Sequence, residues 1–152
     1  MLPASTRASV QPLHHSLILG APDDAAAWQP PTKPVVEVPA GSPPAELVAE
    51  DLVVGTGDEA VSGHQVTVEY VGVAHSTGEQ FDASWDRGQS FRFFLGAGRV
   101  IKGWDQGVAG MRVGGRRKLV IPPHLAYGDR GAGAVIKPGE TLVFVIDLVR
   151  VW

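Results

Sequence analysis

The sequence predicts an α+β domain made of one antiparallel sheet and one short helix. Several segments alternate between apolar and polar residues with a period of two, which is the period of a β-strand. Only one segment repeats apolar residues at spacings of three and four, which is the period of a helix. Because no second helix is predicted, this helix must cover the apolar face of the sheet.

Five segments have the pattern of strands. The clearest is 65–71, in which Val66, Val68 and Tyr70 lie on one face. A short apolar run at 35–38 could add an edge strand just before the domain. The five segments, in chain order, are 46–54, 65–71, 91–95, 117–121 and 141–151.

The last of these segments, 141–151, is the longest. Its first half is apolar on both faces, which is typical of a strand covered on both sides. We therefore expect a central strand. Asp147 and Arg150 are charged, and we expect them to let the end of this strand reach solvent.

The helical pattern lies in residues 99–111. Val100, Ile101, Trp104 and Val108 recur at spacings of three and four and form one apolar face. Two glycines at the end of this segment favour termination there. The sequence thus predicts a short amphipathic helix with a tryptophan on its inner face.

Composition divides the chain near residue 45. Nine of the 12 prolines lie before Ala45, and 17 of the 19 glycines lie after it. Proline at this density removes backbone donors and favours extended, solvated chain. We therefore predict a Pro-rich extension over residues 1–44, mostly disordered or loosely docked, and one folded domain over residues 45–152.

Overall composition disfavours several classes of protein. The net charge of −3 disfavours binding to nucleic acid through phosphate contacts. The chain has no cysteine, hence no disulfide and no thiolate metal site, and this fits the reducing cytoplasm, where we expect the protein to be. No apolar run approaches the roughly 18 residues of a membrane span. The five histidines have no metal-ligand spacing, so we expect no metal and no cofactor.

Aromatic residues between positions 70 and 127 form the candidate site. If Tyr70, Phe81, Phe91, Trp104 and Tyr127 converge, they make an apolar bowl with two hydroxyls at its edge. The aspartate that follows Phe81 adds one carboxylate. Such a bowl would receive an apolar ring rather than attack a bond.

Each of these residues also has an ordinary structural interpretation. A tryptophan on the inner face of a helix is usually core, and Trp104 alone would favour that interpretation. Asp82 lies in a predicted turn, where aspartate usually caps backbone amides, although Arg87 could supply a counter-charge for a functional carboxylate. Tyr127 could simply anchor a turn, and the role of Phe91 depends on the register of its strand.

A series of short motifs follows in order between residues 70 and 144. They are Tyr70-Val71-Gly72, Gly78-Glu79-Gln80-Phe81-Asp82, Val100-Ile101-Lys102-Gly103-Trp104, Gly107-Val108, Met111, Val113-Gly114, Ala126-Tyr127-Gly128 and Leu142-Val143-Phe144. In this order and at these spacings, residues 46–152 resemble the FKBP family of peptidyl-prolyl cis–trans isomerases. The resemblance implies a five-stranded antiparallel half-barrel sheet wrapped around one short helix. One departure is Ala132, which lies where the family often has histidine.

The resemblance also implies roles for particular residues. Trp104 would form the floor of a proline pocket, and Asp82 would lie at its rim, paired with Arg87. The backbone amide of Ile101 and the hydroxyl of Tyr127 would donate hydrogen bonds to substrate carbonyls. The candidate catalytic residues are Asp82, Tyr127, Trp104 and Phe81. The walls of the pocket would be Tyr70, Phe81, Phe91, Val100, Ile101 and Phe144.

The implied activity is faster rotation about X–Pro bonds, and thereby assistance to protein folding, because an apolar aromatic pocket binds the twisted amide. The implied partners are proline-containing polypeptides and, as possible ligands, macrolides of the rapamycin type. Nucleic acid and membranes are not expected as partners, and we expect a monomer. The alternative is an FKBP-like binding or chaperone module with little turnover. A hydrolase is not supported, because Ser84 has neither a histidine nearby in the sequence nor the glycines of a nucleophile elbow.

Overall fold

The computed structural model describes Pro30 and residues 32–152. The predicted disorder of residues 1–29 and 31 falls outside this described part, and the domain boundary near residue 45 stays a prediction. The strands are β1 (Val48–Val53), β2 (Gln65–Ala74), β3 (Gln80–Ala83), β4 (Phe91–Phe94), β5 (Arg116–Ile121) and β6 (Leu142–Val151). The helical elements are α2 (Ser84–Arg87), α3 (Lys102–Gly107) and the 3₁₀ turn η2 (Pro123–Leu125).

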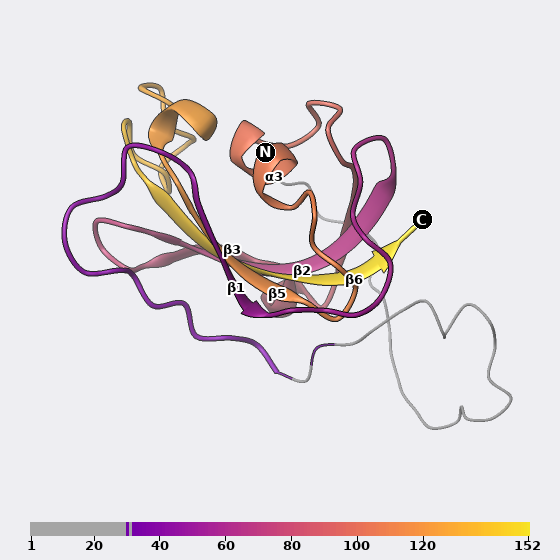
Figure 1. The fold of residues 1–152 in the computed structure, drawn as a ribbon. Coiled ribbons are helices and arrows are strands. Elements are labelled where there is room, and N and C mark those ends of the chain that lie inside the picture. The colour runs from indigo at the N-terminus through magenta and orange to yellow at the C-terminus, as the bar shows by residue number, and fades with distance from the viewer. Residues whose placement is uncertain (1–29, 31) are drawn as a thin grey trace, which may run out of the picture.

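The strands form one antiparallel sheet in the order β1-β5-β6-β2-β3, in which β4 also pairs with β2. The sheet is curved, and α3 lies on its concave side (Figure 1). This confirms the predicted α+β class and the central position of β6, which lies between β5 and β2. The sheet has six strands rather than the expected five.

The additional strand is β3. It pairs with Val71–Val73 of β2, whereas β4 pairs with residues 65–68 of the same strand. Because β6 occupies the other edge of β2, β3 and β4 share one edge, separated by the single helical turn α2. Asp82, which was expected in a turn, lies within β3 and pairs with Gly72 of β2.

Residues of β2 alternate between the two faces of the sheet. Val66, Val68 and Tyr70 are fully buried in the main core between sheet and helix, as predicted. Glu69, Val71 and Val73 therefore lie on the outer face. Each β2 residue on the concave face, such as Tyr70, is therefore followed and preceded in the chain by residues on the outer face.

The outer face of the sheet is covered in part by residues 32–39. Val36 and Val38 pack against a second apolar cluster made of Val73, Val120 and Val143. Figure 1 shows this segment in indigo on the side of the sheet away from α3. Residues 35–38 form no strand. They instead act as an apolar cover for three neighbouring strands.

Two polar contacts also attach this segment. Lys33 Nζ lies 2.8 Å from Asp86 Oδ1, and Arg116 Nη2 donates to the Thr32 carbonyl at 3.1 Å. Arg116 also binds Asp147, whose exposed fraction is 0%. The expectation that Asp147 opens the end of β6 to solvent is therefore wrong. Its charge is instead compensated within the outer face by Arg116.

The helix α3 is shorter than the predicted segment 99–111. It begins at Lys102, because Ile101 has an extended backbone (φ −60°, ψ 150°), and it ends at Gly107. Two of its six residues are glycines that face β5. A Cβ at Gly103 would lie 2.4 Å from the Ile121 side chain, and one at Gly107 would lie 2.7 Å from Leu119. Glycine here lets the helix approach the sheet closely.

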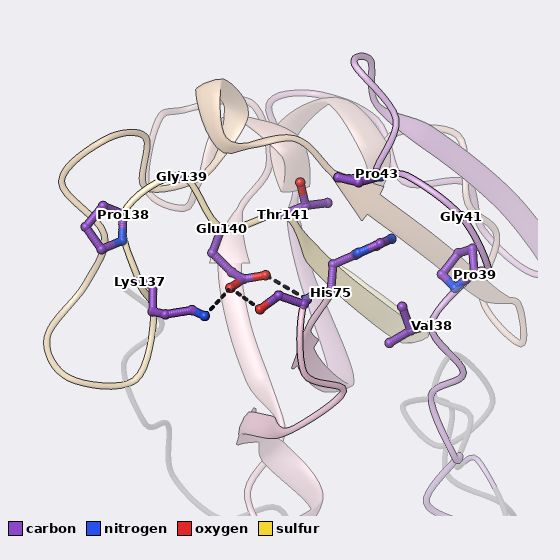
Figure 2. A pocket seen from close by; sticks show the side chains of 11 residues that line it. Val38, Pro39, Gly41, Pro43, His75, Lys137, Pro138, Gly139, Glu140 and Thr141 are labelled. Atoms are coloured by element: carbon purple, nitrogen blue, oxygen red, sulfur yellow. Dashed lines mark hydrogen bonds and ion pairs between the residues drawn. The ribbon is translucent and has the colours of Figure 1, made fainter.

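A cavity of about 550 Å³ lies between residues 38–43 and the loop that precedes β6 (Figure 2). In its wall, the buried Glu140 carboxylate accepts hydrogen bonds from the Ser76 backbone amide at 3.0 Å and the Ser76 hydroxyl at 2.8 Å. None of the candidate site residues lines this cavity. Among the described helices, none is long and apolar enough to cross a membrane.

Candidate active site

Trp104 of α3 is at the centre of an aromatic cluster. Its ring centroid lies 5.0 Å from that of Tyr70, 5.3 Å from Phe144, 5.6 Å from Phe93 and 6.0 Å from Phe91. Most of these pairs meet edge to face, the geometry that aromatic rings prefer. The structure therefore brings together rings from β2, β4, α3 and β6. Phe93, which lies in the predicted strand 91–95, belongs to the same cluster.

The indole of Trp104 has an exposed fraction of 0%. The ring therefore has no face open to solvent in this structure, in contrast to a simple pocket floor. Val100 and Ile101, the other predicted residues of this region, are each 8% exposed and belong to the same core. The partly exposed side chains of the candidate site are those of Phe81, Asp82, Arg87 and Tyr127.

Phe81 extends the cluster toward this edge. Its ring lies 5.5 Å from that of Phe144 and is half-buried. Gly72 makes the approach possible, because a Cβ there would lie 2.6 Å from the Phe144 ring and 2.7 Å from the Phe81 ring. Gly72 is a site residue that sequence reasoning did not single out. The signal that could have identified Gly72 is its position in a strand, where a glycine often marks the close approach of another group to the backbone.

The polar edge of the site consists of Tyr70, Asp82 and Arg87. The Tyr70 hydroxyl donates to Asp82 Oδ2 at 2.7 Å and accepts from Arg87 Nη2 at 2.8 Å. Arg87 Nη1 also binds Asp82 Oδ1, which is the pair that the resemblance implies. The Arg87 guanidinium lies 5.6 Å from the centre of the Tyr70 ring. The link between Tyr70 and this ion pair was not predicted.

Burial raises the pKa of both tyrosine hydroxyls further above physiological pH. It raises the pKa of Tyr70, an effect that the Arg87 hydrogen bond opposes and Asp82 reinforces. It also raises the pKa of Tyr127, to which the negative charge of Asp82 contributes. Both hydroxyls are therefore neutral hydrogen-bond donors at physiological pH.

Tyr127 enters the site from the loop that follows η2. Its half-buried ring packs against the main core. Its carbonyl accepts from the Gly131 amide at 3.1 Å, and the loop closes through reciprocal backbone hydrogen bonds between Ala132 and Ile136 of 2.8 and 3.1 Å. Ile136 is only 5% exposed and anchors the loop in the core. No periodic pattern surrounds Ile136, so the sequence did not indicate it.

Ile101 lies at the start of α3, where its carbonyl accepts a hydrogen bond of 2.9 Å from the Trp104 amide. As the residue before the helix, it has a backbone amide outside the helical ladder. Its role as a hydrogen-bond donor to substrate stays a prediction. Among the described residues, no three side chains of the metal-ligating types lie close enough to hold a metal ion.

Comparison with known proteins agrees with this geometry. Residues 57–149 match the family model for FKBP-type peptidyl-prolyl cis-trans isomerase. An FK506-binding protein of Streptomyces anulatus is 64% identical over 120 residues, which cover 78% of this chain and 97% of that protein. A probable FK506-binding protein of Corynebacterium glutamicum is 53% identical over 117 residues, covering 77% of this chain and 97% of that protein.

Solved structures show the same fold. The crystal structure of AtFKBP13 aligns with a TM-score of 0.64 and 45% sequence identity, covering 70% of this chain and 93% of the other. FkpA from Escherichia coli aligns with a TM-score of 0.63 and 39% identity, covering 69% of this chain and 47% of the other. The family match extends over well more than half of the chain and includes all of the edge and cluster residues described above. The chain therefore belongs to the family of FKBP-type peptidyl-prolyl cis–trans isomerases.

Proposed function

We propose that this protein accelerates cis–trans rotation about X–Pro bonds in polypeptides. The observation that carries the proposal is the polar group of Tyr70, Asp82 and Arg87, held by mutual hydrogen bonds at the edge of the aromatic cluster around Trp104. Such an edge can orient a peptide chain while the neighbouring rings exclude water from its proline.

The reaction requires no nucleophile, because no bond is broken. Rotation about an X–Pro bond faces a barrier near 20 kcal/mol, which arises because resonance is lost in the twisted amide. A site lowers this barrier when it binds the twisted amide better than either planar form. The twisted amide has less charge separation than the planar one, so apolar surroundings favour it relative to water.

Particular groups have distinct tasks in this mechanism. The proline ring would lie against the Phe81 ring, next to the part of the aromatic cluster that contains Phe144 and Trp104. The Ile101 amide and the Tyr127 hydroxyl would donate hydrogen bonds to carbonyls of the flanking chain. Asp82, held by Arg87 and Tyr70, would face the rotating amide as a fixed charge that requires no reorganisation.

The partners of the proposed isomerase are proline-containing polypeptides, and its cellular role would be to assist protein folding. We propose that it acts as a monomer in the cytoplasm. Two relatives are named as proteins that bind FK506. On this basis we also propose that macrolides of the FK506 and rapamycin type occupy the same site. A macrolide would cover the aromatic edge and compete with peptide.

The second candidate is a binding or chaperone module of the same fold with little turnover. The connected group of Tyr70, Asp82 and Arg87 favours an enzyme, because a module that only binds apolar segments has no need of a positioned charge pair.

An isomerisation assay separates the two candidates. The purified chain should raise the cis-to-trans rate of a short X–Pro peptide above the spontaneous rate, and rapamycin should abolish the increase. The folded state of the same sample is checked by circular dichroism. A folded protein that binds rapamycin but leaves the peptide rate unchanged would establish the binding module instead.

A further inference from the structure

The single turn α2 carries Arg87 at its end and follows directly after Asp82 and Ala83 of β3. A helix of four residues has almost no stability of its own, because nucleation is unfavourable. Contacts with the rest of the domain must therefore hold α2 in place. Whatever fixes α2 also fixes the two charged groups at the edge of the candidate site.

Ser84, the first residue of α2, makes the decisive contacts. Its exposed fraction is 0%. Its hydroxyl accepts a 2.8 Å hydrogen bond from the Tyr70 backbone amide and donates a 2.6 Å hydrogen bond to Glu69 Oε1. One buried hydroxyl thus joins α2 to two successive residues of β2.

These contacts close a ring with the polar edge of the site. The first residue of α2 binds the backbone of Tyr70, and its last residue, Arg87, binds the hydroxyl of the same tyrosine. Asp82, two residues before Ser84, accepts a hydrogen bond from the same hydroxyl. Loss of the Ser84 contact would free the start of α2 and leave a buried amide without its partner.

We propose that Ser84 is a positioning residue for the isomerase site: its hydroxyl locks α2 to β2 at Tyr70 and thereby holds Arg87 and Asp82 against the Tyr70 hydroxyl. The hydrogen bonds of the Ser84 hydroxyl are to Glu69 and to the backbone of Tyr70. The inference rests on the proposed function for its activity measurement.

Glu69 on the outer face completes this support. It accepts the hydrogen bond that orients the Ser84 hydroxyl, and it lies opposite Asp147 in the sheet register. Asp147 is itself bound by Arg116 across the next pair of strands. A row of polar residues on the outer face therefore supports a site on the concave face.

The first test compares Ser84→Ala with a matched control, Thr67→Val. Thr67 is a buried residue of the same strand as Tyr70, and its hydroxyl accepts from Trp152 Nε1 at 2.9 Å. Ser84→Ala should lower kcat/KM about tenfold, mainly through kcat, because small misplacements of catalytic groups are costly. Thr67→Val should stay within about twofold of the wild type. Equal activities of both variants and the wild type would overturn the proposal.

A double-mutant cycle then asks whether Ser84 acts through the edge residues. In an Arg87→Ala background, Ser84→Ala should lower kcat/KM by less than about twofold, because the group that it positions is gone. A merely structural role would reduce activity by the same factor in both backgrounds. Equal factors would therefore overturn the proposal.

A spectroscopic measurement separates failure of this inference from failure of the proposed function. Arg87 Nε is buried, so its N–H should give an observable ¹⁵N–¹H resonance. Ser84→Ala should shift or broaden this resonance, and Thr67→Val should not, whether or not the wild type is an isomerase. If Ser84→Ala fails to fold, Glu69→Leu takes its place, with Glu69→Gln as the variant that keeps an acceptor for the hydroxyl. An Arg87 resonance unchanged in Ser84→Ala, or equally changed in Glu69→Leu and Glu69→Gln, would contradict the role of Ser84.

Discussion

The Tyr70 hydroxyl donates a 2.7 Å hydrogen bond to Asp82 at the edge of the aromatic cluster. Tyr70 thereby makes two kinds of contact: its ring packs against Trp104, and its hydroxyl binds the Asp82 carboxylate at the edge of the cluster. Because Arg87 binds both partners, removal of any one of the three leaves the other two with an unmatched polar atom. The polar edge should therefore respond to mutation as a unit.

Asp82→Ala should reduce turnover without unfolding the domain. The substitution removes the carboxylate that both Tyr70 and Arg87 bind, so kcat/KM should fall about tenfold. The Asp82 side chain is partly exposed and contributes little to core packing, so the loss of stability should be about 1 kcal/mol. The peptide assay and thermal denaturation measure the two effects.

Asp51→Ala is the matched control for Asp82→Ala. Asp51 also binds an arginine, Arg117, but it lies on β1, an edge strand that contributes no aromatic ring to the site. Its removal should leave turnover unchanged. Near-native turnover of Asp82→Ala would contradict a functional role for this carboxylate.

The N-terminal segment should stabilise the domain without taking part in turnover, because its ion pair with α2, between Lys33 and Asp86, is exposed and therefore weak. From the sequence, deletion of residues 1–40 is predicted to leave a folded and active domain. The structure adds that this deletion removes Val36 and Val38 from the outer face. Both side chains are half-buried, so the loss should be about 2 kcal/mol, which lowers Tm by roughly 4–10 °C. Deletion of residues 1–31 should have a smaller effect on Tm.

Point variants of the full chain test the same contact without truncation. Val36→Ser combined with Val38→Ser should lower Tm, and Val35→Ser should not, because Val35 is 86% exposed. All variants should keep wild-type turnover. Equal Tm values for the double variant and Val35→Ser would show that the segment does not pack in solution.

Glu69 should make stability depend on pH. Burial raises the pKa of Glu69 above its ordinary value of 4.5, and the nearby charge of Asp147 adds to this effect against the Ser84 hydrogen bond. The folded protein therefore binds this proton more tightly than the unfolded chain does. The resulting stability is complete below pH 4.5 and is lost as the pH rises through the higher folded-state pKa.

Glu69→Gln replaces the titrating carboxyl group by an amide, which stays neutral at every pH tested. The free energy of unfolding of the variant, relative to the wild type, should increase as the pH rises from 4 to 8, because only the wild type acquires a partly buried charge. Urea titrations across this range measure the difference. A constant difference between Glu69→Gln and the wild type would contradict the raised pKa.

The long periodic strands could be predicted from the sequence, because burial on one or both faces leaves a clear pattern. Val66, Val68 and Tyr70 all lie in the core, and β6 is central. The elements β3 and α2 could not be predicted, because tertiary contacts such as those of Ser84 determine them. The burial of Asp147 also depends on a partner, Arg116, from another strand, which no local pattern indicates.

The candidate site could likewise be predicted only where a motif or a periodic pattern marks the residue. The aromatic residues were identified from their motifs, and the structure gathers Tyr70, Phe91 and Phe144 around Trp104. Gly72 and Ile136 were missed, since one acts through the absence of a side chain and the other lies in an irregular loop. The burial of Trp104 likewise depends on the packing of rings from three other elements, β2, β4 and β6.

Trp104→Ala should be the most destabilising of the variants considered. The cost would be smaller if one face of the indole were open to a pocket, but the ring is 0% exposed and contacts four other rings. The full cost of about 3–5 kcal/mol for deletion of a buried aromatic side chain is therefore expected. Denaturant titration of the purified variant measures it, and a cost below about 2 kcal/mol would show that the ring is less enclosed in solution.

Trp104 should also report ligand binding through its fluorescence. A macrolide or proline peptide would contact the half-buried Phe81, whose ring centroid lies 5.5 Å from that of Phe144. Phe144 lies 5.3 Å from the indole, so a shift of these rings on binding would change the surroundings of Trp104. Trp28, Trp85 and Trp152 also emit, so the titration requires a variant in which these three are phenylalanine. Binding is measured independently by calorimetry on the same variant. If calorimetry detects rapamycin binding and the Trp104 emission stays constant, the ligand binds away from this cluster, and Trp104 is an ordinary core residue.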